Sequence, residues 1–524
     1  MNRLPRAVAA LVCLPLFAPL PACPNLDHQV ESDVLGPVVA GDQLLFADRF
    51  SQELIALTLA DGDATGIRRV ALSGPTRTLA VLPDGSAALS LNATTETLDR
   101  IPLTPAGPSS DVVSLELGAP FEALVVSPDS DAAIAFFPPG TATTVFHNTN
   151  EIAFVDLRPE TPVEDAVTRR TLASLGGAPR SVHPSPEVDG RRYAFVLSDE
   201  HVAVLDLSAP DTRERSVPLV SLNTGGQRTP LAIEFAIGTD NTGESVLWGV
   251  VTVAEDNAVY ALKITPTLPT GPQEPAFDVQ LSQLGGFSAG GQVTLVREPD
   301  GDLVTIILNP AQGMATVTKL SNGFAQSVVL SSGINRLDVY TEGDRPIALI
   351  YRQGSTTFHI LDVAELRAKK DKAFRTRTAR QPIASLLPVP GTPLFFAFHD
   401  DANEAVSVID ADTDRVTSFG RTGTVRQAII AQDLGRAYFL TQLGSDSFLV
   451  SVQLDNLHPE SSPIPGGADT LHVMPAAGTV VASRVDEATL GGHLVLWPAL
   501  FTVGDASRAL PGVLLTGLVD RAAE

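Results

Sequence analysis

Cysteine is nearly absent from this chain. Its 524 residues include two, Cys13 and Cys23, both near the N-terminus. Everything after Cys23 therefore contains no disulfide bond, and its stability has to come from the burial of apolar surface. Hydrophobic residues make up 44% of the sequence, which is enough to build a large core.

Basic residues are also few. Lys and Arg total 36 against 60 Asp and Glu, which gives a net charge of −24. A surface of this sign repels nucleic acid and anionic headgroups on average, so we expect no nucleic-acid partner. The chain also lacks a P-loop and a G-x-G-x-x-G fingerprint, the two common phosphate-cradling loops.

No apolar run in the sequence is long enough to cross a membrane comfortably. The N-terminal apolar stretch, "AVAALVCLPLFAPL" at 7–20, has fourteen residues and contains Pro15 and Pro19. A spanning helix needs roughly 20 apolar residues, and internal prolines disfavour one. Because Arg3 and Arg6 precede the stretch, the pattern is that of a secretion signal.

The end of this signal carries a further motif. Leu20-Pro21-Ala22-Cys23 places Leu at −3, Ala at −1 and Cys at +1, which resembles the lipobox of bacterial lipoproteins. Pro21 departs from the usual Ala, Ser or Thr. The resemblance implies a leader over 1–22 and a lipid-modified Cys23. The alternative is a plain secreted protein with one unpaired thiol.

A lipidated Cys23 would carry several acyl chains, which anchor a protein firmly where a single chain binds marginally. The resemblance then implies a linker over 23–35 and export to the outer membrane, because Pro24 is not the Asp that retains such proteins at the inner membrane. The anchored domain would face the periplasm or the cell surface. Without Arg3 and Arg6 the mature chain has 34 basic and 60 acidic residues, a net charge of −26.

Turn formers are abundant, and one phrase recurs between them. The chain has 41 Gly and 40 Pro, which suits a turn-rich β protein. An alternating apolar strand ends in a polar residue at Asp156, Asp206, Asp362 and Asp410. The first two are 50 residues apart and the last two 48. Looser copies end at Thr58, Ile101, Lys263, Lys319, Gln453 and Trp497.

Each repeat contains an apolar strand, a turn, a second apolar strand, a gap and then this phrase. The turn is Pro-Asp at 83–84, 128–129 and 299–300. Three or four short strands every 40 to 60 residues are typical of a β-propeller. The repeats resemble the YVTN-type, lactonase-like propeller family, best in "AVSVIDADTDRVTSF" at 405–419 and next in "VAVLDLSAPDT" at 202–212. The resemblance concerns the fold, because propellers host many functions.

We therefore predict an all-β fold, a β-propeller of four-stranded antiparallel blades over 36–518, followed by a short tail over 519–524. The ten repeats exceed the usual 4 to 8 blades, so we expect about eight blades, within a range of seven to ten. The ring would be closed by pairing its first unit (36–73) or its last strand (512–518).

Motifs for catalysis or metal binding are weak. Residues 286–290 match G-x-S-x-G, but a β-branched strand follows where a nucleophile elbow needs a helix. His399, Asp400 and Asp401 form the best local cluster of metal-ligating residues, while Asp410, Asp412 and Asp414 resemble the opening of a calcium loop. Arg415 and Arg421 stand where an EF-hand needs Gly and Glu. We expect no cofactor, with calcium or another divalent ion as the alternative.

One segment departs from the acidic character of the chain. Residues 367–380 carry seven basic side chains and one acidic one, and they overlap the best helical stretch of the sequence, "DVAELRAKKDKAF" at 362–374. The segment is either a solvated excursion attracted to its own acidic surface or a docking site for an anionic envelope partner. The basic residues are Arg367, Lys369, Lys370, Lys372, Arg375, Arg377 and Arg380.

Two functions fit these features. The favoured hypothesis is a lipid-anchored propeller of the cell envelope that acts as a binding or scaffold module, without catalysis, for a protein or glycan partner. The alternative is an exported, lactonase-like propeller hydrolase that holds a divalent metal at the mouth of its channel.

Overall fold

The computed structural model describes residues 34–511. Gaps within this range fall at 141–146, 173–177, 221–225, 227, 255–257, 269–270, 272, 286–290, 343–344, 369–372, 402–403, 414, 420–422, 487–490 and 503–506. Cys23, the G-x-S-x-G motif, Lys369, Lys370, Lys372, Asp414 and the segment 512–518 therefore lie outside the described residues.

The described chain is nearly all β, as predicted, and its strands pair with their sequence neighbours. They form seven four-stranded sheets, one five-stranded sheet and one seven-stranded sheet. Every pairing is antiparallel, as consecutive strands joined by short turns require.

The strands of the first half, in chain order, are β1 (Val34–Ala40), β2 (Gln43–Asp48), β3 (Glu53–Ala60), β4 (Asp63–Ala71), β5 (Thr78–Val81), β6 (Ala87–Asn92), β7 (Thr97–Thr104), β8 (Gly107–Pro108), β9 (Val113–Glu116), β10 (Ala123–Val126), β11 (Ala132–Phe136), β12 (Glu151–Asp156), β13 (Val167–Thr171), β14 (Ser181–Pro184), β15 (Tyr193–Leu197), β16 (His201–Asp206), β17 (Arg215–Pro218), β18 (Pro230–Thr239), β19 (Ser245–Val253), β20 (Val259–Pro266) and β21 (Phe277–Gly285).

The second half continues with β22 (Val293–Arg297), β23 (Leu303–Asn309), β24 (Met314–Lys319), β25 (Ala325–Val329), β26 (Arg336–Glu342), β27 (Arg345–Tyr351), β28 (Ser355–Asp362), β29 (Phe374–Pro388), β30 (Leu394–His399), β31 (Val406–Asp410), β32 (Arg415–Ser418), β33 (Thr424–Ala431), β34 (Arg436–Leu443), β35 (Asp446–Gln453), β36 (Pro459–Ile464), β37 (Thr470–Met474), β38 (Thr479–Asp486), β39 (Gly491–Pro498) and β40 (Arg508–Pro511). The α-helix α1 (Val363–Arg367) and three 3-10 turns, η2 (Val163–Asp165), η3 (Gln432–Leu434) and η4 (Pro475–Ala477), complete the described elements.

The long strand β29 belongs to two units. Its first part, from Phe374 to Thr378, pairs with β28, and its second part, from Ile383 to Pro388, pairs with β30. The seven-stranded sheet β26–β32 is thus two four-stranded units that share one strand. Counted in this way, the described residues form ten units, numbered here in chain order from unit 1 (β1–β4) to unit 10 (β37–β40).

The expected number of about eight blades is not confirmed. The ten units correspond one to one with the ten repeats, because each repeated phrase ends at or near the third strand of its unit. The lower expectation came from the usual size of propellers, whereas the spacing of the repeats indicated the larger number.

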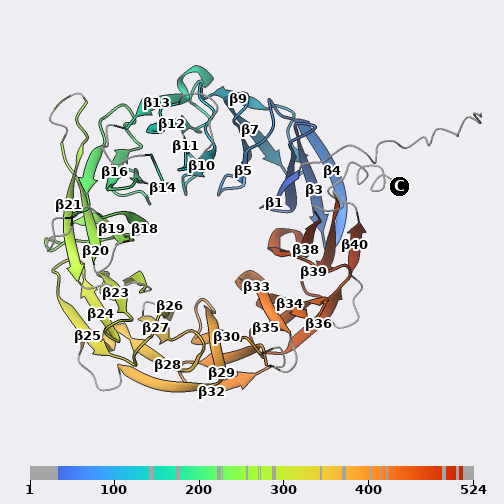
Figure 1. The fold of residues 1–524 in the computed structure, drawn as a ribbon. Helices are drawn as coiled ribbons and strands as arrows, with labels where there is room; N and C mark the ends of the chain where they lie inside the picture. The colour runs from blue at the N-terminus through green and yellow to red at the C-terminus, as the bar shows by residue number, and fades with distance from the viewer. Residues whose placement is uncertain are drawn as a thin grey trace, which may run out of the picture.

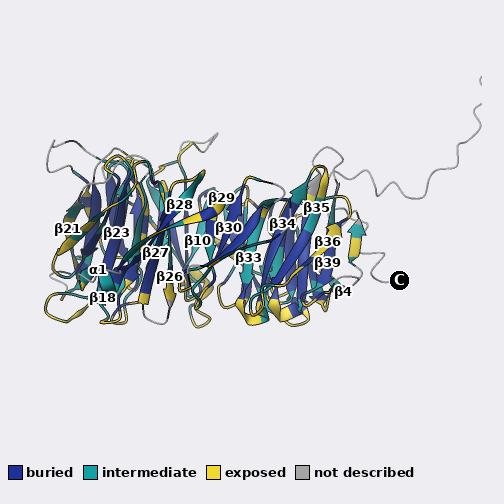
Figure 2. Ribbon diagram, turned by 90° about the horizontal axis from the view of Figure 1, so that it is seen from below, coloured by how far each residue is buried: buried dark blue, intermediate teal, exposed yellow. Residues whose placement is uncertain are grey.

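The units are arranged in a ring, with the first strand of each unit on the inside and the fourth on the outside (Figure 1). Second and third strands are buried along nearly their whole length, as in β11 and β16, because neighbouring units cover both of their faces. Ten clusters of buried apolar side chains fill the interfaces between successive units. In the side view, exposed residues gather at the turns above and below these strands (Figure 2).

The ring is closed by packing of the sheet of unit 1 against the sheet of unit 10. Leu44 and Leu57 of unit 1 join Val481 and Leu494 of unit 10 in one apolar cluster. The amide of Asp61 donates to the carbonyl of Ala477 at 2.8 Å, and Gly62 donates to Thr479 Oγ1 at 2.9 Å. Among the described strands, those of unit 1 pair only with one another, so the expected closure by strand pairing is not seen there.

The ring has two distinct faces. Turns between first and second strands, and between third and fourth strands, lie on one face, which we call the turn face. The hydrogen bond from Asp61 to Ala477 joins one turn of each kind across the closure. Turns between second and third strands, and the links between units, lie on the opposite link face. The chain enters the ring at the link face, because Val34 pairs with Asp48 at the end of β2.

Within the described residues, no helix is long and apolar enough to cross a membrane.

Candidate functional site

The recurring aspartate of the repeats caps a turn. Asp156, Asp206 and Asp410 each accept a hydrogen bond from the backbone amide two residues later, at 2.9–3.0 Å. Asp362 accepts one from the amide of Glu365 at 2.9 Å and so begins α1. Asp side chains favour such turns because they can satisfy a nearby backbone amide.

The same position also forms an ion pair with the neighbouring turn. Asp206 pairs with Arg191 at 2.9 Å, and Asp362 pairs with Arg345. In unit 5 the charges are exchanged, and Lys263 at the phrase position pairs with Asp240 at 2.8 Å. The hydrogen bond from Lys263 holds the pKa of Asp240 below its ordinary value. Lys319 likewise pairs with Asp302. In the two copies of the phrase that end in lysine, the ion pair is therefore present with the positions of the cation and the anion exchanged.

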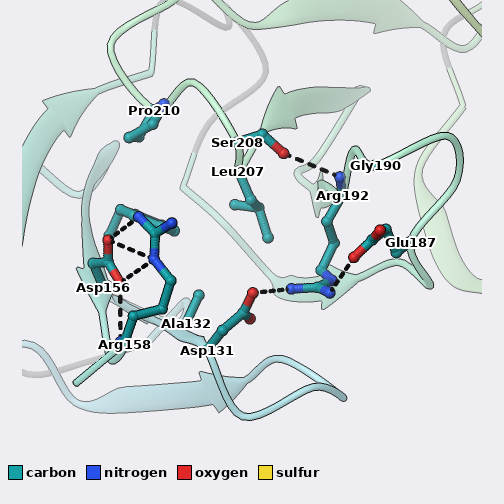
Figure 3. A pocket seen from close by; sticks show the side chains of 11 residues that line it. Asp131, Ala132, Asp156, Arg158, Glu187, Gly190, Arg192, Leu207, Ser208 and Pro210 are labelled. Carbon is teal, nitrogen blue, oxygen red and sulfur yellow. Dashed lines mark hydrogen bonds and ion pairs between the residues drawn. The ribbon is translucent and has the colours of Figure 1, made fainter. Parts of the chain in front are cut away.

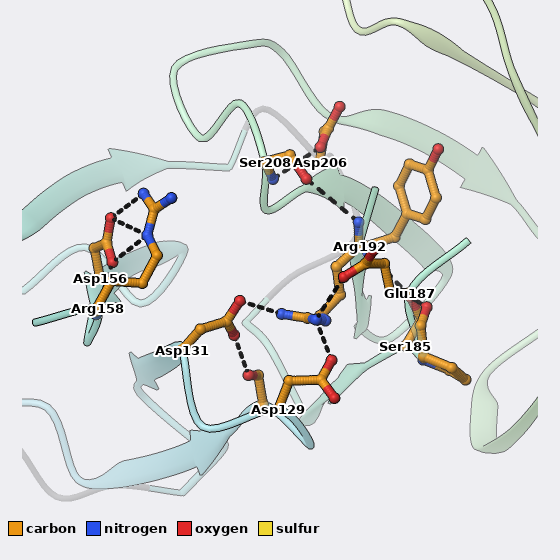
Figure 4. A network of polar contacts seen from close by, with 12 residues as sticks. Asp129, Asp131, Asp156, Arg158, Ser185, Glu187, Arg192, Asp206 and Ser208 are labelled. Atoms are coloured by element: carbon orange, nitrogen blue, oxygen red, sulfur yellow. Dashed lines mark hydrogen bonds and ion pairs between the residues drawn. The ribbon is translucent and has the colours of Figure 1, made fainter. Parts of the chain in front are cut away.

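A larger cluster joins units 3 and 4 on the turn face. The Arg192 guanidinium, at the start of β15, is paired with Asp129 and Asp131 of the β10–β11 turn and with Glu187 at 3.2 Å (Figure 4). Arg192 is 6% exposed, whereas the side chains of Asp129 and Glu187 are 54% and 55% exposed. A nearly buried cation is thus held by carboxylates that still face water.

A cavity of about 310 Å³ lies beside this cluster (Figure 3). Its far side carries a second ion pair, in which Arg158 Nε donates to both carboxylate oxygens of Asp156 at 2.9 and 3.1 Å. Phe154, Leu207 and Pro210 add apolar surface to its lining. The cavity therefore combines apolar walls with charged groups supplied by two adjacent units.

Two carboxyl groups of this cavity, Asp131 and Asp156, have pKa values below the ordinary value of Asp. Burial on its own would raise the pKa of Asp131, but hydrogen bonds from Ser127 and Arg192 outweigh it and hold that pKa below its ordinary value. Burial opposes ionisation of Asp156 as well, and the hydrogen bonds from Arg158 again lower its pKa.

Charge at the cavity favours a cationic ligand. Three carboxylates line it, Asp131, Asp156 and the exposed Glu187, against the two guanidiniums of Arg158 and Arg192. Ionised carboxylates act only as hydrogen-bond acceptors, so exposed carboxylate oxygens at the rim can accept hydrogen bonds from an ammonium or guanidinium group. The apolar walls would contact the hydrocarbon part of the same ligand.

The structure places the candidate metal ligands apart from this cavity. His399 is buried, its Nδ1 donates to the carbonyl of Pro382 at 2.9 Å, and its Nε2 bonds Ser407 Oγ at 2.8 Å. Both ring nitrogens are thus occupied. Asp400 and Asp412 are exposed, and Asp410 caps its turn. Asp401 accepts the amide of Glu404 through its backbone carbonyl. In the part of the chain that the structure describes, no three His, Cys, Asp or Glu residues gather as a metal site.

The basic segment 367–380 is only partly a surface patch. Arg367 forms an ion pair with Glu298, whose carboxylate is buried, and burial lowers the pKa of Arg367. Arg375 donates to the carbonyl of Ala411 at 2.9 Å, and Arg377 to that of Thr376 at 2.9 Å. Arg380 is largely exposed and lies 3.7 Å from Glu404. The helical stretch expected at 362–374 is confirmed over the five residues of α1, whereas Phe374 begins strand β29.

Sequence reasoning missed Arg192. The usable signal was "RRYAFVL", in which two arginines precede a strand that proves to be buried along its length. A cation at the mouth of such a strand needs carboxylates, and "SPDSD" at 127–131 supplies them one repeat earlier. Their proximity depends on how adjacent units pack, which no local pattern reveals.

Comparison with known proteins gives similarity of fold only. No protein-family model matches the chain, and no curated protein matches it. Among solved structures, dihydro-heme d1 dehydrogenase NirN has a TM-score of 0.40 and 13% identity, over 74% of each chain. Apo AztD from Citrobacter koseri has a TM-score of 0.34 and 13% identity, over 82% of this chain and 96% of its own.

Proposed function

We propose that this chain is a lipid-anchored β-propeller of the cell envelope that acts as a non-enzymatic binding module. Its partner would be a protein that inserts a basic side chain into the Arg192 cavity. The observation that carries the proposal is the arrangement of the two faces: β1 begins at the link face, and the cavity opens on the turn face. An anchor at Cys23 would leave the cavity pointing away from the membrane.

The length of the tether supports this orientation. Ten residues lie between Cys23 and Val34, and an extended chain spans at most about 3.6 Å per step, so the eleven steps cover at most roughly 40 Å. A ring held this close to the bilayer by its link face presents the turn face to soluble partners. The net charge of −26 on the mature chain would attract a basic partner and speed its association.

The anchor is tested with the two cysteines of the chain. Cys23→Ser should move the protein from the membrane fraction to the soluble fraction, and mass spectrometry of the wild type should find a diacylglyceryl modification on the new N-terminal cysteine. Cys13→Ser is the matched control, because Cys13 lies in the expected leader, and it should leave fractionation unchanged. An unmodified N-terminus in the wild type would refute the anchor.

The cavity is tested separately with a short lysine-containing peptide in a calorimetric titration. Glu187→Gln should weaken binding by about tenfold, since a charge-assisted contact of the cavity lining is lost. Asp300→Asn is the control: Asp300 occupies the corresponding turn of unit 6 and is 55% exposed, as is Glu187. Equal effects of the two substitutions would show that the peptide responds only to overall charge.

A further inference from the structure

A second cavity, of about 410 Å³, lies between units 9 and 10 on the link face. Its lining includes Arg426 from β33 and Arg484 from β38, together with Ser445 from the turn after β34 and Ser447 from β35. Link-face segments 467–469 complete one side. Two arginines in one cavity are notable in a chain with so large an excess of acidic residues.

Both guanidiniums are oriented by neutral acceptors. Arg426 donates from Nε and Nη2 to Gln442 Oε1, at 2.9 and 2.5 Å. Arg484 donates from Nη1 to the carbonyl of Gly466 at 2.7 Å. Among the described residues, no carboxylate comes within the 4.0 Å of an ion pair with either guanidinium. Both exposed guanidiniums are therefore oriented by neutral oxygens, and neither forms an ion pair with a described carboxylate.

Gly467 keeps the space between these groups open. A Cβ at this position would lie 3.3 Å from Arg484 Nη1 and 3.5 Å from Ser447 Oγ, so both donors point towards the place where a side chain would be. The backbone φ of +79° favours glycine there. The result is an unfilled recess with a guanidinium on one side and a hydroxyl on another.

The donors fit an oxyanion with more than two acceptor oxygens. A guanidinium binds phosphate through paired N–H groups, and two guanidiniums on separate strands can engage different oxygens of one tetrahedral group. Hydroxyls of Ser445 and Ser447 can donate to a third oxygen. Asp469 is the one carboxylate of the described lining, so the cavity keeps a net positive charge.

We infer that this cavity binds a phosphate group. The group could belong to a lipid headgroup or to a soluble phosphate ester, and the chemistry of recognition is the same. The headgroup source rests on the proposed membrane anchor, since the link face would then lie next to the bilayer. Phosphate recognition itself depends only on the geometry of the cavity.

The test uses the full chain carrying Cys23→Ser, titrated with inorganic phosphate in a calorimeter. Saturable binding is expected, and Arg484→Gln or Arg426→Gln should weaken it about tenfold or more, as expected for the loss of a charged hydrogen-bonding group. Arg336→Gln is the matched control. Arg336 also begins a first strand at the link face and donates to a glutamine oxygen, Gln353 Oε1, at 3.1 Å, but it does not line the cavity.

Vesicles of phosphatidylglycerol then distinguish the source. Flotation of the unanchored chain with these vesicles, lost in Arg484→Gln and kept in Arg336→Gln, would assign the phosphate to a headgroup. Binding of inorganic phosphate without flotation would assign it to a soluble ester. Absence of saturable phosphate binding, or equal weakening by all three arginine substitutions, would overturn the inference. Neither result depends on whether Cys23 is lipidated.

Discussion

Closure of the ring includes a close approach of two backbones at Gly62, beside the apolar cluster that joins units 1 and 10. This residue lies in the turn between β3 and β4 of unit 1, with φ of +82°. A Cβ at this position would lie 2.6 Å from Pro498 Cδ and 2.7 Å from the backbone carbonyl carbon of Trp497, in unit 10. These atoms belong to backbone and a proline ring, so no side-chain rotation can relieve the overlap. The substitution Gly62→Ala should therefore loosen the contact between the first and last units.

The expected cost has two parts. A residue with a Cβ at positive φ loses about 1–2 kcal/mol, and overpacking a tight contact adds about 1–3 kcal/mol. The matched control is Gly301→Ala, because Gly301 has φ of +86° with nothing within 4 Å of the added Cβ. The control should lose the first part only, so the difference between the two variants isolates the contact across the closure.

Hydrogen exchange followed by mass spectrometry reports this locally. A loss of about 2 kcal/mol or more in the opening free energy corresponds to exchange faster by roughly thirtyfold or more, and it should be confined to β1–β4 and β37–β40 in Gly62→Ala. Gly301→Ala should affect β22 and β23 instead. Unchanged exchange of both end units in Gly62→Ala would refute the idea that face packing at this point closes the ring.

Three further outcomes are expected. Arg192→Gln should lower the free energy of unfolding by about 1–2 kcal/mol, which is less than the loss of a fully buried ion pair because two of its carboxylate partners face water. Added salt should reduce the difference from wild type, and urea titrations at two salt concentrations measure this. Burial raises the pKa of Asp338 in β26, so the protonated carboxyl stabilises the fold, and this stabilisation is lost as pH rises above the unfolded pKa of about 4. In urea unfolding from pH 4 to 7, Asp338→Asn should therefore gain stability relative to wild type. A difference in stability that stays constant with pH would contradict this prediction. Chelation should leave the melting temperature unchanged, because both ring nitrogens of His399 are hydrogen-bonded; a fall would favour the lactonase-like alternative.

The repeat was the most informative part of the sequence. Alternating apolar residues and Pro-Asp turns are local features, and they correctly predicted an all-β fold of four-stranded antiparallel units. The ending of each phrase even marked the third strand, including the looser copies at Lys263 and Lys319. What the pattern did not reveal is why lysine can replace aspartate there: the compensating Asp240 and Asp302 lie on a different turn of the same unit.

The sites were less accessible to such reasoning. Residues 367–380 stood out as a run of positive charge, yet Arg367 pairs with the buried Glu298 of the preceding unit, a contact set by packing between units. Arg192 and Arg484 looked ordinary in the sequence because their importance comes from neighbours one repeat or one strand away. A run of charged residues in the sequence predicts a charged surface segment. A cavity is formed by residues from separate segments, and their proximity is known only from the fold.

Each sheet in the described ring is built from consecutive strands, and the two ends meet through packed faces and contacts between turns, without strand pairing. Nearly all hydrogen-bonded strand pairing is therefore local in sequence. A chain of this kind can form its sheets one after another as it emerges, each new unit docking on the last. The single long-range event, contact of unit 10 with unit 1, has to wait for the final strands. Until then, the face of unit 1 that later packs on unit 10 exposes Leu44 and Phe46 to solvent. The incomplete ring is therefore the species most prone to self-association.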